Sequence, residues 1–453
     1  MDAVIAYLRD HHAEHLDWAL DLCRIPSVST LPEHRADVAA AVRWTRDLCE
    51  RIGLRAEIHK TEGHPFIYAD HCQAPDAPTL LVYGHLDVQP TGDRALWDAD
   101  PFQPVVRDGW LIARGAADNK GQVLVHLRAA GAWLAAHQRL PLNLKFLIEA
   151  EEEIGSPNLA PFIQDHQDLL RCDHILISDT GMYADGWPTI TCGTRGILSK
   201  EIRLFGPKHD LHSGSFGGTV ANPANELATI VASLHDADGR VTIPGFYDDV
   251  AELSTAERDQ FRALPLNDDE YAANVGCPGI YGEKGYSTNE RRWVRPTLDV
   301  NGIYGGFMGE GANTIIPNHA GAKITMRLVP NQDGQKLSAA FEQTIRDRCP
   351  ASVRLEIIDR GFANAYLAPP NSPPMQAAHR ALQEAFDREP ALIREGGSLP
   401  ILPLFKRALN ADSLLLGFAS PDCNAHGPNE KVCIADLNRG AEAAARLFAY
   451  LAP

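Results

Sequence analysis

The sequence predicts an α/β protein in which a doubly wound mixed sheet is interrupted by a smaller, ferredoxin-like α+β domain. Strand and helix patterns alternate up to about residue 194, which is typical of a doubly wound sheet. Residues 197–361 then follow the order strand, helix, strand, strand, helix, strand, which matches a ferredoxin-like unit. After residue 370 the first pattern returns. We therefore expect one domain from residues 1–194 and 371–453 and an inserted domain from residues 195–370, because 453 residues exceed one ordinary core.

The elements of the first domain are predicted from hydrophobic periodicity and from the residues that end each run. Apolar residues recur at helical spacing in six segments, and Gly53 follows the second of them as a C-cap. These predicted helices are residues 1–22, 38–52, 123–137, 375–386, 400–409 and 434–450. Short apolar runs that end at turn residues or charged residues predict strands at residues 55–59, 66–70, 80–83, 143–148, 174–178 and 413–418.

The inserted domain is predicted in the same way. Its strands are residues 198–204, 297–303, 322–328 and 353–358, and its helices are residues 222–234 and 337–346. Residues 244–295 contain Pro, Gly and charge but little periodicity, so we expect an irregular insertion to which no motif assigns a role.

Composition narrows the possible partners. Lys and Arg number 42 against 59 Asp and Glu, a net charge of −17, which argues against nucleic acid or an anionic membrane as a partner. The N-terminal segment lacks the basic start and apolar run of a signal peptide, and no stretch approaches the roughly 18 apolar residues of a membrane span. Nine Cys without a CxxC pair predict reduced thiols in a cytoplasmic protein.

Polar residues follow several of the predicted apolar strands, where a parallel sheet collects ligands. His85 and Asp87 follow residues 80–83, and Asp87 is spaced to hold the second ring nitrogen of His85. Further candidates in such turns are Asp118, Glu152, Glu153, Asp179 and His426. Two carboxylates 4 Å apart repel by about 4 kcal/mol at an effective dielectric of 20, and only Lys120 and Arg114 lie nearby in sequence. Bound cations would remove that repulsion.

The type of ligand indicates the metal. Mixed imidazole and carboxylate ligands without Cys suit Zn²⁺, with Mn²⁺ or Co²⁺ as substitutes, whereas oxygen ligands alone would indicate Mg²⁺ or Ca²⁺. The alternative for His85 and Asp87 is a solvated turn, and for the run EAEEE a solvated acidic loop. Because this run directly follows the apolar strand at residues 143–148, we expect one of Glu152 and Glu153 to bind metal and the other to take a proton from metal-bound water.

Eight motifs between residues 84 and 430 occur together in one order: GHLDVQP, RGAADNKG, EAEEEIGS, ISDTGM, DLHSGSFGG, GANTIIP, REGGSLPI and HGPNE. Together they resemble the M20 family of di-zinc metallopeptidases, and most closely its branch of cytosolic non-specific dipeptidases and carnosinase-like enzymes. The resemblance implies that His85 and Asp179 bind one zinc ion and that Glu153 and His426 bind the other. It also implies that Asp118 bridges both ions.

The resemblance implies further roles around the metals. Glu152 would be the general base and later the proton donor, and Asp87 would orient His85. The peptide bond between Asp118 and Asn119 would be cis.

The inserted domain and the returning segment would contribute to substrate binding. By resemblance, these residues are His212, Asn313, Arg327, Gly397 and Ser398. Without the resemblance, the alternative for His212 is a hydrogen-bonded loop residue, and the alternative for Arg327 is an exposed charge on an edge strand. Relatives pair through the smaller domain, so we expect a homodimer in which His212 reaches the partner's site.

We therefore expect a metal-dependent hydrolase that cleaves the peptide bond of dipeptides or short peptides. In this reading Arg327 binds the terminal carboxylate of the substrate. The alternative within the family is an N-acyl amino acid deacylase or desuccinylase. A non-catalytic binding protein would lack a ligand or the base, and none is missing here.

Overall fold

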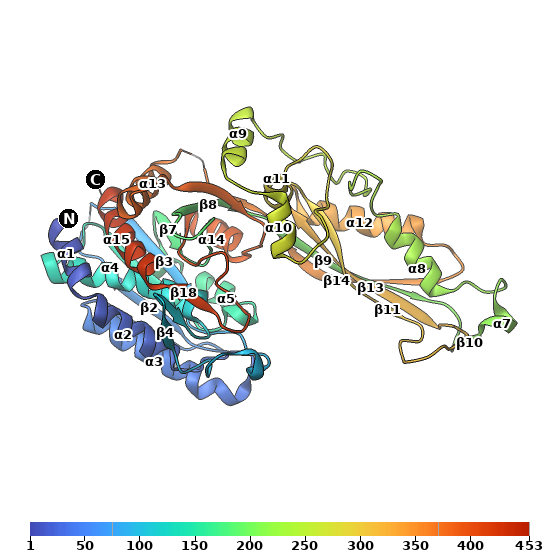
Figure 1. Cartoon of the computed structure of the whole chain (residues 1–453), viewed down its shortest axis with the longest axis horizontal. Coiled ribbons are helices and arrows are strands. Elements are labelled where there is room, and N and C mark those ends of the chain that lie inside the picture. Colours follow the sequence, from blue (N-terminus) through green and yellow to red (C-terminus); the bar gives the residue numbers. More distant parts are fainter. Residues whose placement is uncertain (75, 370, 453) are drawn as a thin grey trace. The chain divides into compact units, whose positions relative to one another are not determined.

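The computed structural model describes residues 1–74, 76–369 and 371–452, and these residues form two compact units (Figure 1). The first unit comprises residues 1–192, 368–393 and 404–453, and the second comprises residues 193–367 and 394–403. The short segment of residues 394–403, with Gly397 and Ser398, thus groups with the second unit.

The first unit is built on a mixed sheet whose strands run in the order β1-β2-β6-β3-β7-β17-β8-β15, with β16 also paired to β8. Its four central strands β6, β3, β7 and β17 are parallel, and the flanking β1, β2 and β8 are antiparallel to their neighbours. The bounds are β1 (Arg55–His59), β2 (Phe66–His71), β3 (Thr79–His85), β6 (Asn143–Glu149), β7 (His174–Ile177), β8 (Thr189–Thr194), β15 (Tyr366–Leu367), β16 (Ala391–Glu395) and β17 (Asp412–Gly417). Of these strands, β15 and the last two residues of β8 and of β16 group with the second unit.

The strand order reverses beside β3. After β3 the chain moves to β6 on one side, then crosses back to β7 on the other side. Such a reversal opens a crevice at the carboxyl ends of the two strands that flank it, here β3 and β7.

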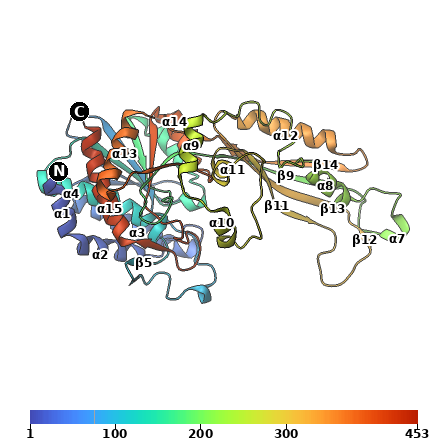
Figure 2. The same cartoon turned by 45° about the horizontal axis from the view of Figure 1, so that its top comes forward.

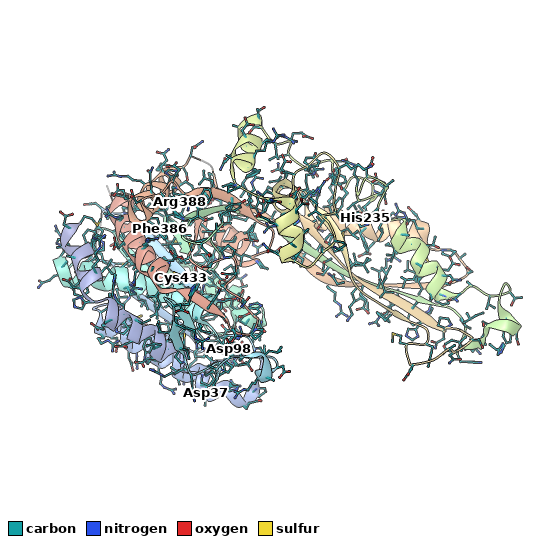
Figure 3. The ribbon with its side chains drawn as sticks, in the orientation of Figure 1. Asp37, Asp98, His235, Phe386, Arg388 and Cys433 are labelled. Atoms are coloured by element: carbon teal, nitrogen blue, oxygen red, sulfur yellow. The ribbon has the colours of Figure 1, made fainter. Side chains whose placement is uncertain are left out.

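The helices of the first unit pack on this sheet and on one another. Helix α4 lies against β3, and α15 lies against α4 and α13 (Figures 1 and 2). Phe386 ends α13, and Cys433 is the N-cap of α15 (Figure 3). The bounds are α1 (Asp2–Asp10), α2 (His12–Cys23), α3 (Arg35–Arg51), α4 (Gly121–His137), α5 (Leu159–Asp165), α6 (Gln167–Leu170), α13 (Pro373–Phe386), α14 (Ile401–Leu409, mostly in this unit) and α15 (Ile434–Leu451).

Short elements complete this unit. A second sheet of three short strands, in the order β18-β5-β4, joins residues 431–433 to the segment before α4. Its strands are β4 (Val105–Arg107), β5 (Trp110–Ile112) and β18 (Lys431–Cys433). The single-turn elements are η1 (Pro32–His34), η2 (Arg94–Leu96), η3 (Ala116–Lys120) and η4 (Glu152–Ile154).

The second unit has the predicted ferredoxin-like order. Its antiparallel strands run β11-β13-β9-β14, and helices α8 and α12 pack on one face through a core that includes Leu198, Met326 and Phe341. Because side chains alternate along a strand, Arg327 points to the opposite face from Met326. The bounds are β9 (Gly196–Phe205), β11 (Thr297–Gly305), β13 (His319–Leu328), β14 (Arg354–Ala363), α8 (Pro223–Ala232) and α12 (Gly334–Arg348).

Two further parts of the second unit depart from this core. A ribbon of β10 (Leu211–His212) and β12 (Ile315–Ile316) leads into the four-residue helix α7 (Ser213–Phe216). The segment that we expected to be irregular contains three short helices, α9 (Thr255–Ala263), α10 (Asp268–Asn274) and α11 (Thr288–Trp293). Ser254 and Ser287 each cap one of these helices through a capping box, a local signal that the weak periodicity of residues 244–295 concealed.

The predicted fold class is confirmed, but the prediction of one helix over residues 1–22 is wrong. The chain breaks at His11, whose ring stacks on Tyr7 and whose Nδ1 lies 2.8 Å from the Tyr7 carbonyl oxygen. No helix among the described residues combines the length and the apolar character needed to cross a membrane.

Candidate metal centre

The crevice between β3 and β7 brings His85 and Asp179 together. Tyr83 of β3 pairs with Ile177 of β7. His85 and Asp179 each lie two positions further along the chain from these paired residues, so they are at the same level of the sheet. The glycine before His85 allows close packing, because a Cβ at Gly84 would lie 2.5 Å from Val123 Cγ2. Helix α4 and the turn before it can therefore approach the end of β3.

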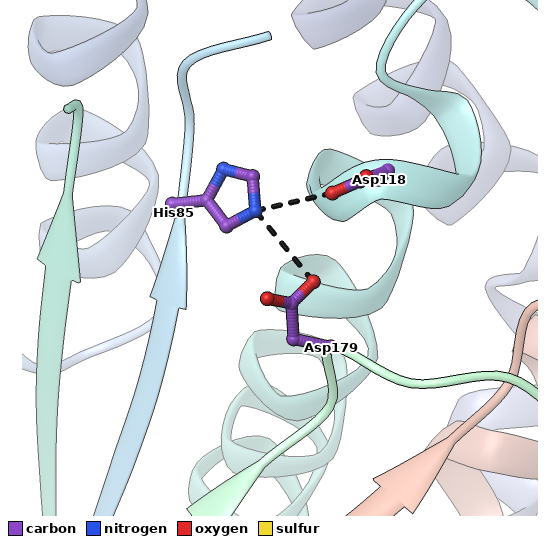
Figure 4. A group of neighbouring side chains, drawn as sticks. All are labelled: His85, Asp118 and Asp179. Carbon is purple, nitrogen blue, oxygen red and sulfur yellow. Dashed lines mark ion pairs between the residues drawn. The ribbon is translucent and has the colours of Figure 1, made fainter. Parts of the chain in front are cut away.

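His85, Asp118 and Asp179 form a compact trio (Figure 4). The Nε2 atom of His85 lies 3.1 Å from Asp118 Oδ1 and 3.6 Å from Asp179 Oδ1. Asp118 comes from η3, the turn that precedes α4, and its peptide bond with Asn119 is cis, as the resemblance implied.

A second trio shares Asp118. The Nε2 atom of His426 lies 2.9 Å from Asp118 Oδ2 and 3.4 Å from Glu153 Oε2. His426 lies in the loop between β17 and β18, and Glu153 lies in η4 after β6. The two oxygens of Asp118 thus point to different histidines, and each trio has one imidazole and two carboxylates within 4.8 Å of one another.

Asp87 holds the ends of both β3 and β6. His85 Nδ1 lies 3.0 Å from the backbone carbonyl oxygen of Asp87 and 3.5 Å from its carboxylate, so the carbonyl is the closer partner. The two carboxylate oxygens of Asp87 accept hydrogen bonds from the backbone N–H groups of Glu152 and Glu153, at 3.1 and 3.0 Å. Asp87 therefore also positions the acidic turn.

Two polar side chains near the centre were not predicted. Asn119 Nδ2 donates to Asp179 Oδ1 at 2.9 Å, and Gln89 Nε2 donates to Glu153 Oε2 at 2.8 Å. Asn119 and Gln89 each follow a candidate ligand within four residues. An amide side chain at that spacing is also common in ordinary turns, so the sequence alone does not show that it contacts a ligand.

The residues of the two trios fit divalent metal ions. The Nε2 atom of His85 and the Oε1 atom of Glu153 are buried. Oε1 has no hydrogen-bond partner among the described residues, and Nε2 faces the carboxylates of Asp118 and Asp179 without a well-aligned hydrogen bond. Imidazole nitrogen and carboxylate oxygen are the types of atom that bind such metals. The donor set of imidazole nitrogen and carboxylate oxygen, without thiolate, matches zinc and its common substitutes.

The two cationic side chains that lie near these turns in sequence are engaged elsewhere. Lys120 Nζ donates to the backbone carbonyls of Leu22 and Ile25, and Arg114 pairs with Glu430 at 2.7 Å. Neither therefore neutralises the carboxylates of the trios, which leaves that role to bound cations or to protonated histidines.

Without a metal, the histidines take up protons in response to the carboxylates. Hydrogen bonds to Asp118 and Glu153 raise the pKa of His426 to about 10. Burial lowers the pKa of His85, but the aspartates around its ring outweigh burial and hold that pKa well above its usual range. The site thus stabilises positive charge at the two positions where metals would bind.

Glu152 lies beside the trios and belongs to neither. Burial raises the pKa of Glu152 to about 7, and the carboxylates of Asp179 and Glu153 add to the effect against the opposing influence of His85. A carboxylate that titrates near neutral pH both accepts and donates a proton readily. The other two glutamates of the run, Glu149 and Glu151, are fully buried and bond to the surrounding protein.

In the second unit, Arg327 and Ser398 are in contact. Arg327 Nη1 donates to Ser398 Oγ at 2.7 Å, and Gly397 precedes Ser398 on the same short segment. Both side chains are half-buried.

His212 and Asn313 lie at the other end of the same unit's sheet. His212 pairs with Ile315 in the β10–β12 ribbon, Asn313 lies two residues before Ile315, and both are exposed. The ribbon joins β13 at its start, whereas Arg327 is near its end, so at about 3.3 Å per residue more than about 20 Å of strand separates them. A single dipeptide cannot contact both groups of one subunit.

The chain is similar to peptidases over nearly its whole length. Residues 81–450 match the family model described as Peptidase family M20/M25/M40. The human Beta-Ala-His dipeptidase is 30% identical over 451 residues, covering 95% of this chain and 89% of the relative. The Cys-Gly metallodipeptidase of Saccharomyces cerevisiae is 33% identical over 395 residues, covering 85% and 82%.

A solved structure agrees with the sequence comparisons. The M20 family metallo-carboxypeptidase of Sulfolobus solfataricus superimposes with a TM-score of 0.85 at 32% identity, covering 97% of this chain and 99% of that one. Because the family model covers well over half of the sequence, this protein belongs to the M20/M25/M40 peptidase family.

Proposed function

We propose that this protein is a metal-dependent dipeptidase with two zinc ions, acting on the peptide bond of dipeptides or short peptides. The observation that carries this proposal is the pair of trios that share Asp118, with Glu152 beside them. Two of the relatives described above are dipeptidases, which favours this activity over removal of an acyl group from an amino acid.

In this proposal His85 and Asp179 would hold one ion, Glu153 and His426 would hold the other, and Asp118 would serve both. The two bound ions would polarise the scissile carbonyl and lower the pKa of a water molecule at the site. Mn²⁺ or Co²⁺ would suit the same ligands.

The chain's own residues then move the protons. Glu152 accepts a proton from the attacking water and passes it to the leaving nitrogen, a sequence that a pKa near 7 favours in both directions. Asp87 maintains the geometry, since it bonds to His85 and to the backbone of both glutamates. Arg327, with Ser398 and Gly397 beside it, binds the substrate carboxylate through its planar guanidinium.

A substrate panel tests this function. The zinc-loaded protein should hydrolyse free dipeptides with a kcat/KM at least about tenfold above that for acetyl- or succinyl-amino acids, since 1.4 kcal/mol of transition-state preference suffices for this ratio. Higher turnover of the acyl amino acids would establish a deacylase. Release of single C-terminal residues from longer peptides would indicate a carboxypeptidase, as in the Sulfolobus solfataricus relative.

We also propose a homodimer formed through the second unit, in which His212 and Asn313 of one subunit complete the other subunit's site. The separation of His212 from Arg327 along β13 supports this arrangement, as does the exposure of both ribbon residues. A histidine at that position would stabilise the oxyanion as the carbonyl is attacked.

Subunit mixing tests the dimer. His212→Ala and Glu152→Gln should each be nearly inactive alone. In a mixed dimer, one site has its own Glu152 and the partner's intact His212, so an equal mixture should recover about a quarter of wild-type activity. Mixed dimers that are confirmed by mass and remain inactive would show that His212 acts within its own subunit or not at all.

We place this enzyme in the cytoplasm. None of the nine cysteines, all of which lie among the described residues, forms a disulfide bond, which supports a reducing compartment.

A further inference from the structure

Glu430 is a buried carboxylate that has no role in the chemistry described above. It ends the sequence HGPNE, and its side chain is completely inaccessible to solvent. Both of its oxygens nevertheless have two donors each. Oε1 accepts hydrogen bonds from the backbone N–H groups of Ala117 and Asp118, at 2.9 and 3.0 Å. Oε2 accepts from Arg114 Nη1 at 2.7 Å and from the backbone N–H of Gly115 at 2.9 Å.

All four donors belong to residues 114–118, the segment that carries Asp118. The backbone of Glu430 adds a fifth bond, because its carbonyl accepts from the N–H of Ala113 at 3.0 Å. Gly115 has a φ of 83° in the left-handed region, which turns the chain so that successive N–H groups point to one carboxylate. The side chain of Glu430 thus holds the backbone segment that positions Asp118.

Arg114 extends this arrangement to the loop that carries His426. Its guanidinium is buried, and Nη2 donates to the backbone carbonyl of His426 at 3.1 Å and to that of Pro90 at 3.2 Å. His426 itself has a φ of 62°, a conformation that non-glycine residues adopt only when neighbouring contacts hold them there. The ion pair of Arg114 and Glu430 therefore joins three loops around the metal centre.

We propose that Glu430 is the positioning residue that sets the spacing between Asp118 and His426, and with it the affinity of the site for two metal ions. It acts through backbone groups and through Arg114, and it bonds to no candidate ligand side chain. This inference rests on the proposed function, because it assumes that the two trios bind metal. Outer residues that orient metal ligands typically change metal affinity by 10- to 100-fold.

Glu430→Gln isolates the effect because it preserves the volume of the side chain. The amide of Gln has one oxygen that accepts hydrogen bonds and one NH₂ group that only donates them. Whichever way the amide is turned, its NH₂ group would face two of the N–H donors that now bond to Glu430. Two of the four side-chain bonds are therefore lost. We expect the dissociation constant for Zn²⁺ to rise on the order of 10- to 100-fold, together with faster amide hydrogen exchange across residues 113–120 of the metal-free protein.

Glu442→Gln is the matched control. Glu442 is also a buried glutamate of the first unit, 6% exposed, but its carboxylate pairs with Arg9 at 2.8 Å. Its loss should change neither Zn²⁺ affinity nor exchange at residues 113–120. Each protein is titrated with Zn²⁺ alone against a competing chelator, and exchange is followed by mass spectrometry.

The outcomes are distinguishable. Wild-type affinity and wild-type exchange in Glu430→Gln would overturn the positioning role, as would equal losses in Glu442→Gln. If Glu430→Gln does not fold, Glu430→Asp, which keeps the charge but withdraws it by one methylene, is judged by the same two measurements. A wild-type protein that binds no metal would overturn the proposed function and this inference with it. Two ions bound equally tightly by wild type and variant would overturn this inference alone.

Discussion

The two units provide functional groups in contrasting environments. At the sheet edge of the first unit, the side chains of His85 and Asp87 are buried. His426 is exposed, but its ring contacts the carboxylates of Asp118 and Glu153. In the second unit, His212 and Asn313 are exposed, and Arg327 is half-buried with Ser398 as its partner. A buried polar group must be satisfied by the protein, by ordered water or by a bound ion, whereas an exposed group remains available to a substrate or a second subunit. Substitutions in the first region should therefore change metal binding or the chemistry at the metals, and those in the second should change substrate binding.

Asp118→Ala should have the largest effect, because one residue serves both trios. We expect both metals to be lost and activity to fall below about 10⁻³ of wild type, since the nucleophile and the polarised carbonyl both depend on the ions. Metal analysis of the purified variant checks this. A variant that retains two equivalents of metal would remove the bridging assignment.

Glu152→Gln should separate proton transfer from metal binding within the first region. The variant should retain both metals and the wild-type fold, but it should lose on the order of 10²-fold or more in kcat, the usual contribution of a general base. Steady-state kinetics on metal-loaded protein measure the loss. Nearly normal kcat would assign the base to another residue.

Arg327→Met should show the behaviour expected of the second region. For free dipeptides we expect kcat/KM to fall about 10- to 100-fold, which corresponds to a lost charged hydrogen bond of about 1.5–3 kcal/mol. For dipeptides amidated at the C-terminus the loss should be much smaller, and metal content should not change. Equal losses on both substrates would indicate that Arg327 only supports the sheet.

His126→Gln should have the smallest effect, visible in stability rather than catalysis. Burial lowers the pKa of His126 to about 3, and its Nε2 lies 2.8 Å from Ser178 Oγ beneath Asp179. His126 therefore stays unprotonated in the folded protein at pH values where the unfolded chain already binds a proton there, because the pKa of an unfolded histidine is about 6.5. This contribution to stability is present above that pH and is lost as the pH falls from about 6.5 towards 3, at about 1.4 kcal/mol per pH unit.

The variant cannot take up this proton, so the free energy of unfolding of the metal-free protein should depend less steeply on pH between 6 and 4.5. Urea unfolding at several pH values measures the slope. His137→Gln, at the exposed end of the same helix, is the control and should retain the wild-type slope. Parallel slopes in all three proteins would show that His126 is not the group responsible.

Apart from the cis bond after Asp118, the parts of the structure that could be predicted share one property, which is that the signal is local. His85 follows an apolar strand, and the reversal of strand order beside β3 brings it to Asp179 by the general geometry of parallel sheets. The ferredoxin-like order of the second unit is likewise visible in its periodicity, and the structure confirms it. The cis bond after Asp118 was implied by the resemblance and by no local signal, and the structure contains it.

The features that were not predicted depend on contacts between distant segments or on very short elements. Glu430 bonds to residues 312 to 316 positions away, and nothing in its immediate neighbours indicates this. Strands β4 and β18 have three residues each, too few to show a period. The break at His11 arises from one side chain bonding to a carbonyl in the preceding turn, within a helical hydrophobic pattern that continues unchanged.

The position of β17 in the sheet has a consequence for how the protein is made. Residues 193–367 contain every strand of the four-stranded sheet of the second unit, so this sheet can form as soon as that stretch has left the ribosome. The first unit must wait, because β17 pairs with both β7 and β8 and is synthesised more than two hundred residues after β7. At typical elongation rates of about 5–20 residues per second, this interval is on the order of 10–50 s. During that time the nascent chain displays His85, Asp118 and Asp179 but not His426, so the proposed metal pair could be acquired only when translation is almost finished.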